Sequence, residues 1–145
     1  MKLDLLSKLI ENTYVDKVPP IVRLNRQPMN EAVQQFQNSV FIQLYEQLKD
    51  VDSERFRQEE QAWTVKFLNE GAEDAGGPYR ESIALMCSDL QSPFLPLFIP
   101  CPNSKEGTGE NRDKFIPNPE CIDPRFLRIY NFIGKVNLNN SIKFN

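Results

Sequence analysis

The 145-residue sequence contains no histidine, three cysteines, one tryptophan and only six glycines. Without histidine, a nucleophilic cysteine has no imidazole to act as its paired base, and the cysteines have no CxxC spacing that would predict a zinc site. We therefore expect no metal and no cofactor. An odd number of cysteines fits a reducing compartment better than a disulfide framework, so the predicted location is the cytoplasm, with the nucleus as an alternative.

Long hydrophobic runs and basic blocks are also missing. The apolar stretches are far too short to span a bilayer, and the charged N-terminus is not a convincing secretory signal. With 17 basic and 20 acidic residues the formal charge is −3, so the sequence does not indicate nucleic-acid binding. The 40% hydrophobic and 26% charged content is that of a globular protein. The length fits one small domain or a piece of a larger one.

The most informative stretch is Trp63–Glu81, where three kinds of local signal follow each other. A short apolar run, Trp63 to Leu68, predicts a buried strand. An acidic, glycine-bearing loop follows from Glu70 to Gly77, and Pro78 is well placed to open a helix that runs to about Leu90. The glycines allow backbone angles that are closed to other residues. We therefore predict a tight turn that seats the helix on the strand.

The remaining segments predict a mainly helical α+β protein with a few short strands. Residues 29–49 show one apolar stripe at helical spacing, and the helix at 123–135 begins with Asp123 as N-cap and is apolar around most of its circumference. We expect that second helix to need burial on several sides. Further expectations are an N-terminal helix within residues 1–17, a strand at 21–24, a solvated charged connection at 52–61, extended segments at 93–100 and 115–119, and a flexible polar loop at 103–112.

Residue chemistry alone identifies no active site. Cys87 lies on the apolar side of a predicted helix, and Cys101 and Cys121 have no activating neighbour, so all three are interpreted as structural. The loop Gly71–Gly77 stands where a phosphate-binding loop would, but it carries acids and no lysine. Glu70, Glu73 and Asp74 could form an acid–base set, yet a solvated or helix-capping role is the favoured interpretation.

Residues Val65–Glu81 resemble the V-x-F-x-x-E-x-x-x-D-x-G-G-x-x-R-E signature of HECT-type ubiquitin ligases. The matching positions are Glu70, Asp74, Gly76, Gly77, Arg80 and Glu81. The flanks are also similar to that family, from about Val18 to Lys135. The similar blocks are Ile21–Arg26, Phe36–Leu48 with its Gln47-Leu48 pair, Phe115–Pro119, and Phe126–Lys135 with its Y-x-F-x-G-[RK] pattern.

The resemblance implies that residues 18–135 form part of the N-terminal lobe of a HECT domain. Such ligases accept ubiquitin from a conjugating enzyme onto a cysteine and pass it to a substrate lysine. That cysteine belongs to the C-terminal lobe, so no catalytic residue is carried over, and we expect a truncated chain that is inactive alone. The six signature residues are then scaffold, with Gly76 and Gly77 making the turn and Arg80 and Glu81 in polar packing.

Two functions from different classes follow from the resemblance. One is a fragment of a ubiquitin ligase, whose full-length form has ubiquitin and a conjugating enzyme as partners. The other is a non-catalytic module or decoy that binds ubiquitin or a ligase partner. Residues 136–145 depart from the family pattern into an Asn-rich tail. We expect the helix from Asp123 to lack its covering partners and the isolated chain to be only marginally folded.

Overall fold

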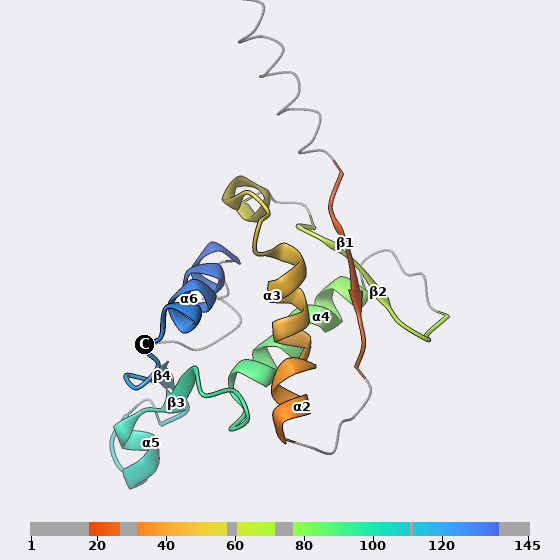
Figure 1. Cartoon of the computed structure of the whole chain (residues 1–145). Coiled ribbons are helices and arrows are strands. Elements are labelled where there is room, and N and C mark those ends of the chain that lie inside the picture. The colour runs from red at the N-terminus through yellow and green to blue at the C-terminus, as the bar shows by residue number, and fades with distance from the viewer. Residues whose placement is uncertain (1–17, 27–31, 58–60, 72–76, 111, 137–145) are drawn as a thin grey trace, which may run out of the picture.

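The computed structural model describes residues 18–26, 32–57, 61–71, 77–110 and 112–136 (Figure 1). It is α+β and mainly helical, as the sequence predicted. The predicted helix within residues 1–17 lies outside the described residues, as do residues 137–145 of the predicted tail. The elements in chain order are β1 (Ile21–Leu24), α2 (Ala32–Gln37), α3 (Val40–Leu48), the 3₁₀ helix η1 (Ser53–Arg57), β2 (Thr64–Phe67), α4 (Gly77–Leu90), β3 (Phe98–Pro100), α5 (Pro102–Glu106), β4 (Phe115–Pro117) and α6 (Pro124–Val136).

β1 and β2 pair in parallel, with Ile21 opposite Thr64 and Leu24 opposite Phe67. The chain between them forms α2, α3 and η1, which is the crossover that a parallel pair requires. Alternate side chains of both strands are buried, so one face of the pair contacts the core. In Figure 1 the pair lies on one side of α3 and α4, and α6 lies on the other.

Two glutamines of α3 bond to the edge of β1 that faces away from β2. The Gln47 amide donates to the Arg23 carbonyl at 2.8 Å and accepts from the Arg23 N–H at 3.0 Å. Gln43 makes the same pair of bonds with Asn25, at 2.7 and 2.8 Å. The polar side of this helix therefore satisfies backbone groups that an edge strand would otherwise leave to solvent.

The single helix predicted over residues 29–49 is wrong, because the chain breaks it at Ser39. Ser39 has non-helical backbone angles (φ −58°, ψ 145°), and its hydroxyl accepts the N–H of Ile42 as the N-cap of α3. The Phe41 N–H, which the new helix start leaves without a helical acceptor, donates to the Asp89 carboxylate of α4 at 3.1 Å. The apolar stripe continues across the break, which is why its spacing gave no warning.

Two segments predicted as solvated loops contain structure. In the 52–61 connection, η1 buries Arg55 to 4% exposure, and its Nε–H donates to the Ala62 carbonyl at 3.2 Å. A buried guanidinium is tolerated when carbonyl oxygens satisfy its donors. In the 103–112 loop, α5 begins with Pro102 and ends at Gly107, which has φ 67°. That positive φ favours glycine, so Pro and Gly mark the two ends of the short helix.

α6 begins at Pro124, and the Asp123 carboxylate accepts the Arg125 N–H at 2.8 Å, as the predicted cap requires. It buries Ile129, Phe132 and Ile133 on one side, whereas Leu127 remains 56% exposed, so the described chain covers only part of a helix that was expected to need burial on several sides. The apolar face packs against η1 and the aromatic side chains of α3, so it has partners within the described chain.

The segment 93–100 was predicted to be extended, but only its end is a strand. β3 pairs antiparallel with β4, with Ile99 opposite Ile116, which confirms an extended segment at 115–117. The residues before β3 form turns that bury Leu95 and Leu97 almost completely. The fully buried apolar side chains of the core come from β1, α3 and α4 and from the residues just before β2 and β3: Val22, Leu24, Phe41, Leu44, Leu48, Trp63, Met86, Leu90, Leu95 and Leu97.

Candidate functional site

The signature stretch forms the end of β2, the loop after it and the start of α4. β2 ends at Phe67, and Asn69 then adopts φ 62°, a left-handed angle that asparagine tolerates better than most residues. Asn69 thus turns the chain directly after β2, whereas the turn predicted at Gly76-Gly77 lies partly outside the described residues. Gly77 is the first residue of α4. The predicted positions Asp74 and Gly76 lie outside the described residues.

Glu70 and Glu81 converge on Arg26, which follows β1. The Arg26 Nε–H donates to Glu70 Oε1 at 2.7 Å, and a terminal nitrogen of the same guanidinium reaches the second oxygen of that carboxylate. The other terminal nitrogen donates to Glu81 Oε1. The guanidinium carbon also lies 4.3 Å from the centroid of the Phe67 ring. One cation thus ties together the ends of β1 and β2 and the first turns of α4.

The electrostatics of this cluster favour charged, paired side chains. Hydrogen bonding to Arg26 holds the pKa of Glu70 below its usual value, and the two carboxylates raise the pKa of Arg26. A carboxylate that is engaged at both oxygens by a guanidinium is a poor proton acceptor. The geometry therefore favours a scaffold role for Glu70 over a place in an acid–base set, whose other candidates, Glu73 and Asp74, lie outside the described residues. Arg80, the residue before Glu81, is exposed in the first turn of α4.

We expect Glu70→Gln to lower the thermal midpoint at pH 7, because the amide loses the charge-assisted pair with Arg26. A carboxylate whose pKa is lowered by folding stabilises the protein above its unfolded value, 4.5, and that contribution disappears as the pH falls through the folded value. The difference between wild type and variant should therefore shrink below pH 4.5. Calorimetry across this pH range measures it.

Glu54→Gln is the matched control, since Glu54 pairs with Arg57 in an exposed i,i+3 bridge and its loss changes the net charge equally. The structural role of the Arg26 cluster would be contradicted if Glu70→Gln lowered the thermal midpoint only as much as Glu54→Gln does. It would also be contradicted if the loss in thermal midpoint of Glu70→Gln grew as the pH falls.

The thiols of Cys87, Cys101 and Cys121 are all buried. Burial raises the pKa of the Cys87 thiol, so the nucleophilic thiolate is disfavoured there. Cys121 Sγ lies 3.1 Å from the Pro96 carbonyl, next to Tyr130, whose hydroxyl donates to the Leu97 carbonyl. Burial, together with Cys121, raises the pKa of Tyr130 to about 12. These surroundings keep the Tyr130 hydroxyl protonated, and the contacts of Cys121 fit a packing role.

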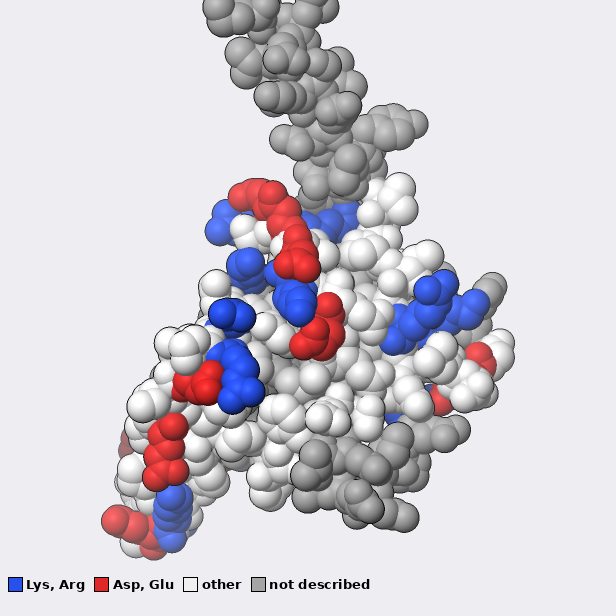
Figure 2. All heavy atoms as spheres, in the orientation of Figure 1, with Lys and Arg blue, Asp and Glu red and all other residues white. Residues whose placement is uncertain are grey.

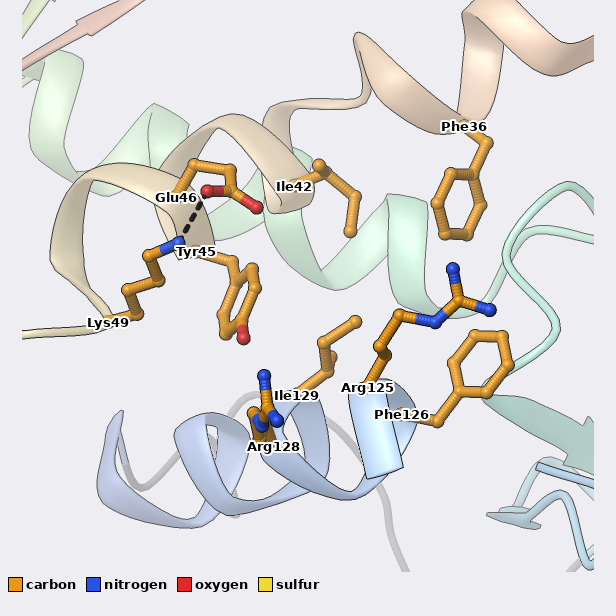
Figure 3. A pocket seen from close by; sticks show the side chains of 9 residues that line it. All are labelled: Phe36, Ile42, Tyr45, Glu46, Lys49, Arg125, Phe126, Arg128 and Ile129. Atoms are coloured by element: carbon orange, nitrogen blue, oxygen red, sulfur yellow. Dashed lines mark hydrogen bonds and ion pairs between the residues drawn. The ribbon is translucent and has the colours of Figure 1, made fainter. Parts of the chain in front are cut away.

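A groove of about 350 Å³ lies between α3 and α6 and has no counterpart in the sequence predictions (Figure 3). Its apolar lining comes from α2, α3 and α6, and Arg125, Arg128 and Lys49 stand at its rim. Figure 2 shows Lys and Arg atoms gathered over this region, with carboxylates beside them. Within the described ranges there is no cluster of three potential metal ligands, and no helix has the length and apolarity needed to cross a membrane.

Comparison with known proteins finds relatives that are all named as E3 ubiquitin-protein ligases. The chain is 33% identical over 122 residues to the E3 ubiquitin-protein ligase HERC2 of Mus musculus, a match that covers 79% of this chain and 2% of that protein. Human HERC2 is 32% identical over the same length, and human HECTD4 is 24% identical over 138 residues, which is 90% of this chain and 3% of HECTD4. No family model matches the chain, and no solved structure does.

The relatives define a class, the E3 ubiquitin-protein ligases. This chain is similar over most of its length to ligases of that class, and the resemblance to HECT-type ligases predicted from the signature is confirmed. The chain corresponds to about 2–3% of the length of these relatives.

Proposed function

We propose that this chain serves as a scaffold portion of a HECT-type N-terminal lobe and does not itself carry ubiquitin as a thioester. The observation that carries the proposal is the Arg26 cluster. Both signature glutamates, Glu70 and Glu81, meet Arg26, which follows the strand that opens the similar region. Their role in this arrangement is to fix β1, β2 and α4 relative to one another.

The cysteines support the second half of the proposal. Ubiquitin transfer needs an accessible thiolate, and Cys87, Cys101 and Cys121 are each no more than 8% exposed. The chain also has no histidine that could deprotonate a thiol. The parent activity would then be ubiquitin transfer from a conjugating enzyme to a substrate lysine. In that setting ubiquitin and the conjugating enzyme are the expected partners of the complete ligase.

The test is a charging assay with activating enzyme, conjugating enzyme and ubiquitin, resolved on a non-reducing gel. We expect no reductant-sensitive ubiquitin adduct on this chain, whereas an intact HECT ligase in a parallel reaction should form one. A reductant-sensitive adduct that disappears when Cys101 or Cys121 is replaced by serine would overturn the proposal.

The alternative function, a non-catalytic module that binds ubiquitin or a ligase partner, stays a prediction. Titrating labelled ubiquitin with the chain tests it directly. Saturable binding without an adduct would favour the module, and no binding would favour the scaffold alone.

A further inference from the structure

The groove between α3 and α6 belongs to a longer hollow that follows α6. A second hollow shares Tyr45, Lys49 and Arg128 with the groove, and a third shares Asn131 and Lys135 with the second. Together they follow α6 from Arg125 to Lys135, about 15 Å of helix at 1.5 Å per residue. That length accommodates two to three turns of another helix.

The floor of the groove is apolar. Phe36 of α2, Ile42 and Tyr45 of α3, and Ile129 of α6 line it, and in Figure 3 their side chains project toward the space between the two helices. Rows of apolar side chains on two neighbouring helices form the surface into which a third amphipathic helix can pack. The floor alone does not identify its occupant.

The charge along the hollow identifies the chemistry of the occupant. Its lining carries five cationic residues and two carboxylates, a formal charge of +3, in a chain whose overall charge is −3. Lys49, Arg57 and Arg125 already pair with nearby acids. Arg128 and Lys135 form no ion pair with another residue that the structure describes. Both can therefore accept carboxylates from outside.

We propose that the α3–α6 groove binds an acidic amphipathic helix from a partner protein. The apolar side of that helix packs on the half-buried rings of Tyr45 and Phe126, and its carboxylates meet Arg128 and Lys135. The cationic rim selects acidic over basic helices, because like charges at the rim of a contact oppose association. This interaction is independent of thioester chemistry and goes beyond the proposed scaffold role.

The test uses the full 145-residue chain and a short fluorescein-labelled peptide. The peptide places leucine and phenylalanine at i, i+3, i+4 and i+7 and glutamate at the other positions. We expect saturable binding in fluorescence anisotropy that weakens as salt is added, since screening reduces the attraction. A peptide with lysine at every glutamate position should not bind, and one with serine at the apolar positions should bind far less.

Variants then locate the site. Arg128→Glu combined with Lys135→Glu should weaken binding of the acidic peptide about tenfold, because two attractive contacts become repulsive. Lys66→Glu is the charge-matched control for each of the two groove substitutions made singly, since Lys66 is exposed on β2 and does not line the hollow. Circular dichroism checks that each variant is folded. The comparison of acidic and basic peptides uses the wild-type chain, so it does not depend on whether the variants fold.

Three outcomes would overturn the proposal. The first is absence of saturable binding, or equal binding of the acidic and basic peptides. The second is equal weakening by Lys66→Glu and by the groove variants. The third is sedimentation of the chain alone as a dimer that the groove variants dissociate, because the occupant would then be a second copy.

Discussion

Trp63→Ala is expected to lower the free energy of unfolding by about 3–5 kcal/mol, the range for removing a large aromatic side chain from a core. Trp63 is 1% exposed and stands edge-on to Tyr79, with ring centroids 4.9 Å apart, and to Phe56 at 6.2 Å. Its indole N–H donates to the Ser82 hydroxyl at 3.2 Å. The side chain thus joins η1, the start of β2 and α4, so its loss opens a cavity where three elements meet.

Urea unfolding followed by circular dichroism measures this effect, since the variant lacks the only tryptophan for fluorescence. A stability of about 5–15 kcal/mol is usual for a domain, so the variant should lose a large part of its folded population. Leu127→Ala is the control, because that leucine is 56% exposed and should change stability by less than about 0.5 kcal/mol. Equal effects of the two substitutions would show that Trp63 does not organise the core.

Phe132→Ala should have an effect of similar size, about 3–5 kcal/mol, but concentrated at α6. Phe132 is 3% exposed, and its ring contacts those of Phe41, Tyr45 and Phe56 at centroid distances of 6.2, 5.4 and 6.3 Å. These contacts hold α6 on α3 and η1. Phe132→Leu keeps most of the buried volume and should lose less, about 1.5 kcal/mol.

Hydrogen exchange separates a local from a global effect. We expect amide protection in α6 of Phe132→Ala to fall further than protection in α3, because α3 also packs against β1 and α4. A transition like that of wild type would contradict this account of α6.

The parts of the fold that sequence predicted are those where local signals and tertiary packing agree. β2, α4 and α6 each combine a clear apolar period with a starting or flanking signal, such as Asp123 and Pro124. The break at Ser39 was missed because the stripe of apolar side chains runs through it. α5 was missed although Pro102 and Gly107 mark its ends, a signal that could have been used.

The candidate site was only half predictable. The signature singled out Glu70 and Glu81, but their partner Arg26 is 44 and 55 residues away along the chain, and no spacing rule connects such positions. Burial of Arg55 depends on the direction in which η1 presents its guanidinium. The groove depends on how α3 and α6 are placed relative to each other, which two separate helical stripes do not specify.

The glutamine pair on α3 has a consequence for how this protein meets other chains. Gln43 and Gln47 each give one donor and one acceptor to the backbone, at Asn25 and Arg23. Because these two residues are alternate positions along the chain, the glutamines imitate the backbone of a third strand. An extended peptide that approaches this border of the sheet finds its hydrogen-bonding positions taken. Strand addition, the usual route by which short β-pairs recruit partners or aggregate, is therefore closed on that side.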